Sequence, residues 1–380
     1  MNRRICGYAT PEATKNYADQ MKAQVGEGHF SDFLETQIKL SSLGLGTFPG
    51  TPQAETDEQI MQLIVDGIAS GINVIDTAAH YRYGRALTAV GAGLKACLEQ
   101  GETRNAVFVI SKGGFLTLRG GRPDNFDRWF EREIVESGLG RKDDLVNNMH
   151  LLSPEYINYQ IDLSRNLMGL ETLDAFLVDQ PEVHIPVIGK EKTNHKLLKV
   201  FVQLEQAIKD RRIRAYGIST FDAMRVETDD VKFQSLTSML GLAEKAAQEV
   251  HGDGAEHGFK LVQMPFNHVM TEGFTRFSHA TGQGNIASTL QAAYQLGVYV
   301  MASHTLMKGH LALAKNDQLS SFLPLLENAA QRSIQFNRST PGLGTSLVGM
   351  SQVSHLLDML AVTKLAPMPK KNYLALYAKS

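Results

Sequence analysis

Eight short apolar runs, rich in β-branched and aromatic residues, recur along the 380-residue chain with helical patterns between them. Their residues do not alternate between apolar and polar, as expected of strands that are buried on both faces of a parallel sheet. Regular strand–helix alternation implies parallel pairing, and eight strands are the number that closes a barrel. The sequence therefore predicts an α/β protein, a (β/α)8 TIM barrel, with an open doubly wound sheet as the alternative. The predicted strands are Leu40–Phe48, Asn73–Ala78, Val107–Lys112, Leu173–Asp179, Ala215–Thr220, Leu261–Asn267, Val298–His304 and Thr345–Met350.

Sequence signals mark several of the intervening helices. Thr56 stands three residues before Gln59, a capping-box spacing, and apolar residues then recur on one helix face. Ser153 is followed by a proline, the residue favoured at the first helical position. The segment Leu197–Ile208 shows the same 3.6-residue period, and Phe233–Val250 is predicted to form one more helix.

One barrel accounts for the length of the chain, so we predict a single domain over residues 1–380. Within it we expect an N-terminal extension over residues 1–38, the barrel over residues 39–365 and a C-terminal tail over residues 366–380. Long loops are predicted after the third strand, over residues 113–152, and after the fifth strand, over residues 222–258. Long loops after barrel strands usually shape the substrate site.

Composition narrows the possible partners and compartments. The formal net charge is −2 and no block of basic residues stands out, so nucleic acid is not expected as a partner. No apolar run approaches the length of a membrane span, and the N-terminal residues lack the apolar core of a secretion signal. Cys6 and Cys97 are far apart in the sequence, which argues against a disulfide framework or a zinc site. We therefore expect a cytoplasmic protein outside the membrane, as a monomer or small homo-oligomer, without a metal.

An acid, a phenol and an amine stand at the ends of neighbouring predicted strands. Asp76 lies at the end of the second strand, Tyr81 follows it by five residues, and Lys112 ends the third strand. A free tyrosine has a pKa near ~10, and a neighbouring ammonium favours the phenolate and lowers that value. These residues predict a proton-transfer site. The alternative is that Asp76 caps a loop and Lys112 is its ordinary ion-pair partner.

Several motifs occur in a characteristic order and spacing. They are Gly71–Ala78 followed by Tyr81, the strand that ends in Lys112, Ser153–Ile157 opening a helix, Ile213–Ser219, Val262-Gln263 with Asn267 behind, and Thr340-Pro341-Gly342 leading to Leu347–Met350. Together they resemble the aldo/keto reductases, NADPH-dependent (β/α)8-barrel enzymes, from about Leu40 to Leu360. The lead-in Ala9–Thr14 and the segment Arg338–Gly342 resemble a longer bacterial branch of that family.

The resemblance implies a catalytic tetrad of Asp, Tyr, Lys and His, and the first three carry over to Asp76, Tyr81 and Lys112. Tyr81 would donate a proton to the substrate carbonyl oxygen as hydride arrives from the nicotinamide. Lys112 would lower the pKa of Tyr81, and Asp76 would hold the lysine in place.

The fourth tetrad position departs from the family pattern, because Asp179 stands where the family has histidine. An ionised Asp179 would repel a carbonyl oxygen, so it would assist reduction only if burial kept it protonated. Family members that reduce a steroid carbon–carbon double bond carry a glutamic acid here, which implies an enone substrate or altered chemistry. The alternative is a protein that no longer turns over. His80 and His150 would supply the missing imidazole or line the substrate pocket, together with His304.

The resemblance also implies NADPH (NADP) as the cofactor. Ser219 and Thr220 occupy the positions of the amide-binding pair, and Ser303 stands where the family has an aromatic platform for the nicotinamide. The usual basic residues for a 2′-phosphate are replaced near the C-terminus. The candidate cofactor-binding residues are Ser219, Thr220, Gln263, Ser303, Lys308, Gly349, Ser351 and His355.

Three functions are compatible with these residues. The leading hypothesis is an NADPH-dependent oxidoreductase that reduces a carbonyl or conjugated enone of a small metabolite. A second keeps Tyr81, Lys112 and Asp179 as acid/base groups but drops the hydride, giving a lyase, dehydratase or isomerase. A third is a catalytically weakened homologue with a binding role.

Overall fold

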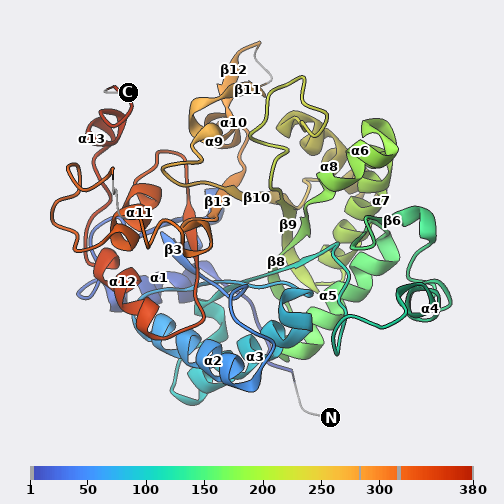
Figure 1. Ribbon diagram of the computed structural model, residues 1–380, viewed down its shortest axis with the longest axis horizontal. Helices are drawn as coiled ribbons and strands as arrows, with labels where there is room; N and C mark the ends of the chain where they lie inside the picture. The colour runs from blue at the N-terminus through green and yellow to red at the C-terminus, as the bar shows by residue number, and fades with distance from the viewer. Residues whose placement is uncertain (1–3, 282–283, 315–317, 379–380) are drawn as a thin grey trace.

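The computed structural model describes residues 4–281, 284–314 and 318–378. Within these residues, eight parallel strands close into a barrel and follow one another around it in chain order, with the last strand pairing with the first (Figure 1). This confirms the predicted barrel and excludes the open doubly wound sheet. The barrel strands are β3 (Leu43–Gly46), β4 (Val74–Asp76), β5 (Phe108–Gly113), β8 (Leu173–Asp179), β9 (Ile213–Ser219), β10 (Phe259–Pro265), β13 (Tyr299–Ser303) and β14 (Thr345–Gly349).

Helices surround the barrel and bury their apolar faces against its outer surface (Figure 1). The longer ones are α2 (Ala54–Ala69), α3 (Arg85–Glu99), α5 (Pro154–Met168), α7 (Lys190–Lys209), α8 (Leu236–His251), α10 (Thr289–Gln295), α11 (Ala329–Arg338) and α12 (Ser354–Thr363). The start of α5 is as predicted, since the Ser153 hydroxyl accepts a hydrogen bond from the Tyr156 N–H. The capping box at Thr56 is wrong, because α2 begins two residues earlier and the Thr56 hydroxyl instead faces that of Thr51 at 3.3 Å.

The first predicted strand, Leu40–Phe48, is in fact two elements. β2 (Lys39–Ser41) pairs antiparallel with β1 (Phe30–Asp32), and only β3 joins the barrel. Between β1 and β2, Phe33 packs its ring 5.2 Å from that of Phe108 and 5.1 Å from that of Tyr299. The hairpin therefore covers the N-terminal end of the barrel interior, and a continuous strand would not allow this. The helix α1 (Pro11–Met21) and the turn η1 (Leu34–Thr36) complete this lead-in segment.

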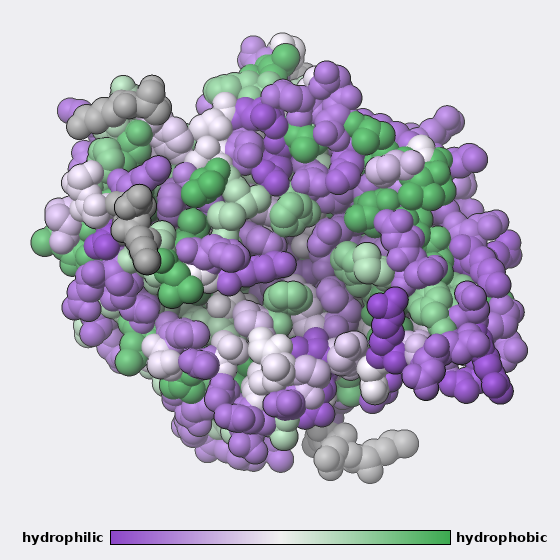
Figure 2. All heavy atoms as spheres, in the orientation of Figure 1, coloured by the Kyte–Doolittle hydropathy of each residue, from purple (hydrophilic) through white to green (hydrophobic). Residues whose placement is uncertain are grey.

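The loops on the opposite side, at the C-terminal ends of the strands, carry elements of their own. The predicted loop after β5 contains α4 (Phe126–Phe130), η4 (Glu131–Val135), η5 (Lys142–Asp144), β6 (Leu145–Val146) and β7 (His150–Leu151). Two long connections were not predicted. The first follows β10 and contains α9 (Glu272–Thr275), β11 (Phe277–Ala280) and β12 (Ile286–Ser288), and the second follows β13 and contains η7 (Met307–Gly309). Figure 2 shows a predominantly hydrophilic face that is hollowed near its middle.

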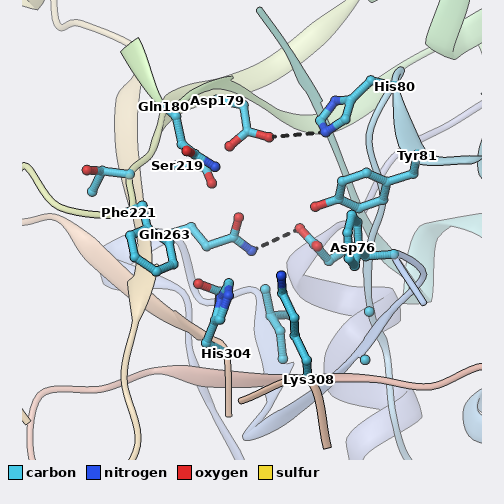
Figure 3. Close-up of a pocket in the computed structure, with 16 residues that line it drawn as sticks. Asp76, His80, Tyr81, Asp179, Gln180, Ser219, Phe221, Gln263, His304 and Lys308 are labelled. Carbon is cyan, nitrogen blue, oxygen red and sulfur yellow. Dashed lines mark hydrogen bonds and ion pairs between the residues drawn. The ribbon is translucent and has the colours of Figure 1, made fainter. Parts of the chain in front are cut away.

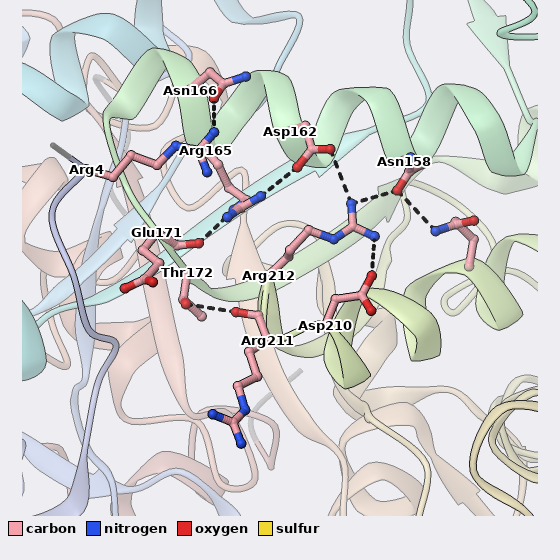
Figure 4. A network of polar contacts seen from close by, with 11 residues as sticks. Arg4, Asn158, Asp162, Arg165, Asn166, Glu171, Thr172, Asp210, Arg211 and Arg212 are labelled. Carbon is pink, nitrogen blue, oxygen red and sulfur yellow. Dashed lines mark hydrogen bonds and ion pairs between the residues drawn. The ribbon is translucent and has the colours of Figure 1, made fainter. Parts of the chain in front are cut away.

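A polar network links the starts of two barrel strands to the helices outside them (Figure 4). Arg212 donates to Asn158 at 2.7 Å and contacts Asp162 at 3.3 Å, so the start of β9 is tied to α5. Arg165 bridges Asp162, at 2.6 Å, and the backbone oxygen of Glu171, at 2.7 Å. Interactions at this end of a barrel serve stability, since catalytic groups lie at the other end.

The short helix α13 (Lys370–Leu374) packs against α11, where Tyr373 is fully buried against Phe336 and accepts a hydrogen bond from Thr340. The division into extension, barrel and tail stays a prediction. Within the described ranges, no helix combines the length and the apolar content that crossing a bilayer requires.

Candidate active site

Asp76, Tyr81 and Lys112 come together at the C-terminal ends of β4 and β5. The Lys112 ammonium donates to the Asp76 carboxylate at 2.7 Å, to the Thr77 carbonyl at 3.1 Å and to the Tyr81 hydroxyl oxygen at 3.0 Å. An ammonium has three N–H donors, and these contacts use all of them. The Tyr81 oxygen therefore acts as an acceptor toward Lys112, which leaves its own proton free to be donated elsewhere.

Burial dominates the electrostatics of this cluster. It raises the pKa of Tyr81 well above the ordinary value, and Lys112 opposes that rise without reversing it. Lys112 thus lowers the pKa of Tyr81, as predicted, but in the free protein the effect of burial is larger. Burial alone would lower the pKa of Lys112, but Asp76 and the other groups around it raise it overall. At neutral pH the site thus holds a protonated phenol beside an ammonium.

The turn that carries Tyr81 is strained and clamped. In η2 (Tyr81–Gly84), Arg82 and Tyr83 have φ of 48° and 60°, in the left-handed region that side chains other than glycine disfavour. Asp57, in the first turn of α2, contacts Arg82 at 2.6 Å and Arg85 at 2.5 Å. Arg82 follows Tyr81 directly and Arg85 begins α3 at the end of the turn, so this carboxylate fixes the conformation of the turn. Sequence analysis missed the role of Asp57, because no local pattern links it to a turn 24 residues later.

Asp179 ends β8 and is almost fully buried. Burial raises its pKa to about 6, while Lys112 and a hydrogen bond from Ser219 act in the opposite direction. The His80 Nε2 atom lies 3.9 Å from the Asp179 carboxylate (Figure 3). Burial, and then the charge of Lys112, lowers the pKa of His80 to about 3, so its imidazole is neutral.

His150 lies behind Asp179 and does not line the cavity, which corrects the expectation that it belongs to the substrate pocket. Its Nε2 is 2.6 Å from the backbone oxygen of Asp179, and its Nδ1 is 2.9 Å from His184 Nε2. A carbonyl oxygen only accepts, so the proton sits on Nε2 of His150 and its Nδ1 accepts from His184. The fit depends on Gly114, since a Cβ there would lie 2.5 Å from the His150 ring. His150 thus fixes the end of β8.

Most of the candidate residues line one cavity of about 290 Å³ (Figure 3). The predicted residues on its wall are Asp76, His80, Tyr81, Asp179, Ser219, Thr220, Gln263, Ser303, His304, Lys308 and Gly349. Sequence analysis missed Phe48, Gln180 and Phe221, which also line it. Each stands one or two residues after the end of a barrel strand, and that position was the available signal.

A second cavity of about 470 Å³ lies between the loop after β13 and helix α12. Ser351, His355 and Asp358 line it. The two cavities share Phe48, His304, Lys308, Leu347 and Gly349, so they form one continuous hollow. The candidate cofactor-binding residues divide between the two cavities, as an elongated ligand would require.

Three of those candidates have side chains that are already engaged within the protein, and one of them is Ser219, which donates to Asp179. Gln263 donates to Asp76 at 3.1 Å. The Thr220 hydroxyl donates to Glu182 at 2.7 Å and accepts from the Ala223 N–H at 2.9 Å. Glu182 is buried and also accepts from the Phe221 N–H at 2.7 Å, so it shapes the turn after β9. Thr220 therefore contributes to the form of the cavity wall.

Metal-binding side chains do not gather in threes anywhere in the part of the chain that the structure describes. In the polar loop that follows α8, His257 is half-buried, and at the end of that helix His251 pairs with Glu205 at 3.1 Å.

Comparison with known proteins places this site in a family. The family model "Aldo/keto reductase family" matches residues 42–379. The NADH-specific methylglyoxal reductase of Escherichia coli (strain K12) is 27% identical over 196 residues, which are 50% of this chain and 51% of that protein. The chain thus aligns with about half the length of this curated relative.

Solved structures with the same fold cover nearly the whole chain. An aldo/keto reductase from Klebsiella pneumoniae in complex with NADP and acetate has a TM-score of 0.58 at 15% identity, covering 94% of this chain and 95% of that one. A holo aldo-keto reductase from Bacillus halodurans has a TM-score of 0.60 at 15% identity, covering 92% and 95%. At such identity these two likenesses concern the fold alone, whereas the family model spans nearly all of the barrel; this chain belongs to the aldo/keto reductase family.

Proposed function

We propose that this protein is a nicotinamide-dependent oxidoreductase that reduces the carbonyl group of a small metabolite, with Tyr81 as the proton donor. The observation that carries the proposal is the free proton of Tyr81 at the wall of the cavity, beside the buried Lys112 ammonium. A bound reduced nicotinamide would supply hydride to the carbonyl carbon. Tyr81 gives its proton to the carbonyl oxygen, and Lys112, held by Asp76, stabilises the phenolate that remains.

The residues of the two cavities suit a dinucleotide. In the smaller cavity, Ser219, Ser303 and His304 would surround the nicotinamide end. In the larger cavity, Lys308, Ser351 and His355 would hold the rest, and the Lys308 cation supports NADPH. Asp358 lines the same cavity, and the Escherichia coli relative is NADH-specific, so NADH is the alternative that the test must include.

Asp179 bears on the choice between a carbonyl and a conjugated enone as the substrate, and we keep both. Burial raises the pKa of Asp179 to about 6, which favours the protonated acid that either reaction needs at this position. We further propose that the protein works on neutral small molecules in the cytoplasm, as a monomer or small homo-oligomer. The hydride-free lyase, dehydratase or isomerase is the alternative, and it needs no nicotinamide.

The test is a titration of the purified protein with NADPH and with NADH, followed by cofactor fluorescence. We expect micromolar binding of at least one cofactor, and its oxidation when small aldehydes or ketones are added. The Tyr81→Phe variant should bind the cofactor equally well and fail to oxidise it. Absence of binding of either cofactor at near-millimolar concentration would overturn the proposal and leave acid/base chemistry without hydride.

A further inference from the structure

The long loop after β5 encloses a cavity of its own. This cavity has a volume of about 340 Å³ and is lined by residues of α4, η4 and α5, toward the periphery of the molecule (Figure 1). It shares no lining residue with the two cavities of the active site, and none of the residues 113–152 lines either of those. The loop therefore forms a second concave surface, apart from the active site.

Aromatic rings from two helices line this cavity. Trp129 belongs to α4, and Tyr156 and Tyr159 belong to α5. The two tyrosine rings lie nearly parallel, with centroids 5.9 Å apart and an interplanar angle of 25°. Tyr159 is 37% exposed, and Trp129 is half-buried. Aromatic surface that is left open in a cavity can stack against a planar ring, so these residues indicate an aromatic ligand.

The charged residues that line the cavity leave one positive charge without a partner. Arg132 is paired with Glu133 at 2.7 Å. The Arg119 guanidinium has neither a hydrogen bond nor an ion pair with any residue that the structure describes. A guanidinium presents a planar fork of N–H donors that matches a carboxylate. One unpaired cation suits a monoanion, whereas a phosphate would bring about two negative charges.

Packing beneath the cavity holds its walls in place. A small apolar core, separate from the core of the barrel, is formed by Leu116, Phe130, Ile134, Leu151 and Tyr156. The Tyr156 hydroxyl oxygen accepts a hydrogen bond from the Thr117 N–H at 2.9 Å, which ties the loop to α5. Arg119 follows in a tight turn, closed by a hydrogen bond of 2.9 Å from the Gly121 N–H to the Leu118 carbonyl. A ligand would therefore meet a preformed surface, which reduces the ordering that binding requires.

We propose that this cavity is a binding site for a small aromatic monocarboxylate. The ring of the ligand stacks on Trp129 and Tyr159, and its carboxylate binds the Arg119 guanidinium. A volume of about 340 Å³ admits one ring with a short side chain. This inference does not depend on the proposed function. Because the cavities share no lining residue, the ligand and a nicotinamide can be bound at the same time.

The test uses the fluorescence of Trp129, which reports on this cavity because the sequence contains no other tryptophan. The protein is titrated with hydrocinnamate in the absence of a nicotinamide, and three analogues are then measured in competition with it. The analogues are hydrocinnamyl alcohol, which has no charge, cyclohexanepropionate, which has no aromatic ring, and phenyl phosphate, which carries about two negative charges.

We expect a dissociation constant below about 1 mM for hydrocinnamate. The constant should be at least about tenfold higher for the alcohol, because it cannot make charge-assisted hydrogen bonds with Arg119. It should be at least about threefold higher for cyclohexanepropionate, which cannot stack, and for phenyl phosphate, whose second charge has no partner in the cavity.

Two variants locate the binding. Arg119→Gln should raise the dissociation constant of hydrocinnamate at least about tenfold and leave that of the alcohol unchanged. Arg122→Gln is the matched control, since Arg122 is an exposed arginine of the same loop that does not line the cavity, and it should keep the wild-type values. Arg119 is exposed as well, so neither change disturbs the apolar core of the loop.

Three results would overturn the inference. They are a Trp129 fluorescence that stays constant up to about 10 mM hydrocinnamate, equal affinities for the acid and the alcohol, and an unchanged dissociation constant in Arg119→Gln. Tighter binding of phenyl phosphate than of hydrocinnamate would overturn the assignment of a carboxylate. All of these outcomes are independent of the cofactor titration that tests the proposed function.

Discussion

Loss of the Tyr81 hydroxyl and loss of the Lys112 ammonium should affect stability differently, because the two groups play different parts in the hydrogen bonds of Lys112. The ammonium is fully buried and is compensated by Asp76, whereas Tyr81 contributes a neutral hydroxyl. Removing the hydroxyl therefore leaves no buried charge without a partner. Removing the ammonium leaves the Asp76 carboxylate with Gln263, on the opposite wall, as its donor among the described residues. Catalysis and stability should respond differently to the two changes.

We expect Tyr81→Phe to lower kcat by about a hundredfold to ten-thousandfold, the usual contribution of a general acid, with cofactor affinity and stability retained. Lys112→Met should lose activity as well and also lower the free energy of unfolding, by about 3–5 kcal/mol. Steady-state kinetics and urea unfolding of both variants give the measurement. Wild-type turnover in Tyr81→Phe would show that another group supplies the proton.

At the scale of elements, the turn that carries Tyr81 depends on a contact with α2. Two consecutive residues in the left-handed region cost about 1–2 kcal/mol each, so the turn relaxes unless something holds it. Asp57 holds it through Arg82, which is almost fully buried, and through Arg85. Asp57 thus acts on the Tyr81 hydroxyl from a distance, as a positioning residue.

Asp57→Ala should lower kcat by about a hundredfold while the cofactor dissociation constant stays unchanged, because a small misplacement of a catalytic group can cost that much. The conservative Asp57→Glu should recover part of the lost rate. Glu58→Ala is the matched control, since Glu58 is the exposed neighbour in the same helical turn. A wild-type kcat in Asp57→Ala would mean that the turn keeps its conformation without the clamp.

Helices and strands could be predicted from the sequence where a local pattern of residues determines them. Strands buried on both faces are near-continuous apolar runs, which is why all eight barrel strands were predicted. Leu40–Phe48 was misjudged because its division depends on Phe33 reaching the distant Phe108 and Tyr299. The ion pairs of Asp57 and the hydrogen bonds of Glu182 to the turn after β9 could not be predicted either. Each of these contacts joins residues that are distant in the sequence and meet only once the barrel has folded.

At the scale of the whole molecule, buried histidines couple stability to pH. Burial, with help from neighbouring cations or histidines, lowers the pKa of His29 and His150 to about 4 and that of His80 and His184 to about 3. In the unfolded chain a histidine has a pKa of about 6.5 and binds a proton below it. The unfolded state then binds more protons, so the stability that is complete above about pH 6.5 is lost as the pH falls. Asp179, with its raised pKa of about 6, acts in the opposite direction and offsets part of this loss.

His29 offers the clearest test, because it lies far from the cavity. It bonds to the Gly71 carbonyl at 3.0 Å and to Ser42 at 3.1 Å, beneath the barrel. Between about pH 7 and about pH 5, one such histidine should account for about 2 kcal/mol of the lost unfolding free energy. His29→Gln removes that proton site, so the difference between urea unfolding free energies at the two pH values should shrink by this amount. His195→Gln, at an exposed position on α7, is the control. An unchanged difference in His29→Gln would mean that the pKa of His29 is not lowered in the folded protein.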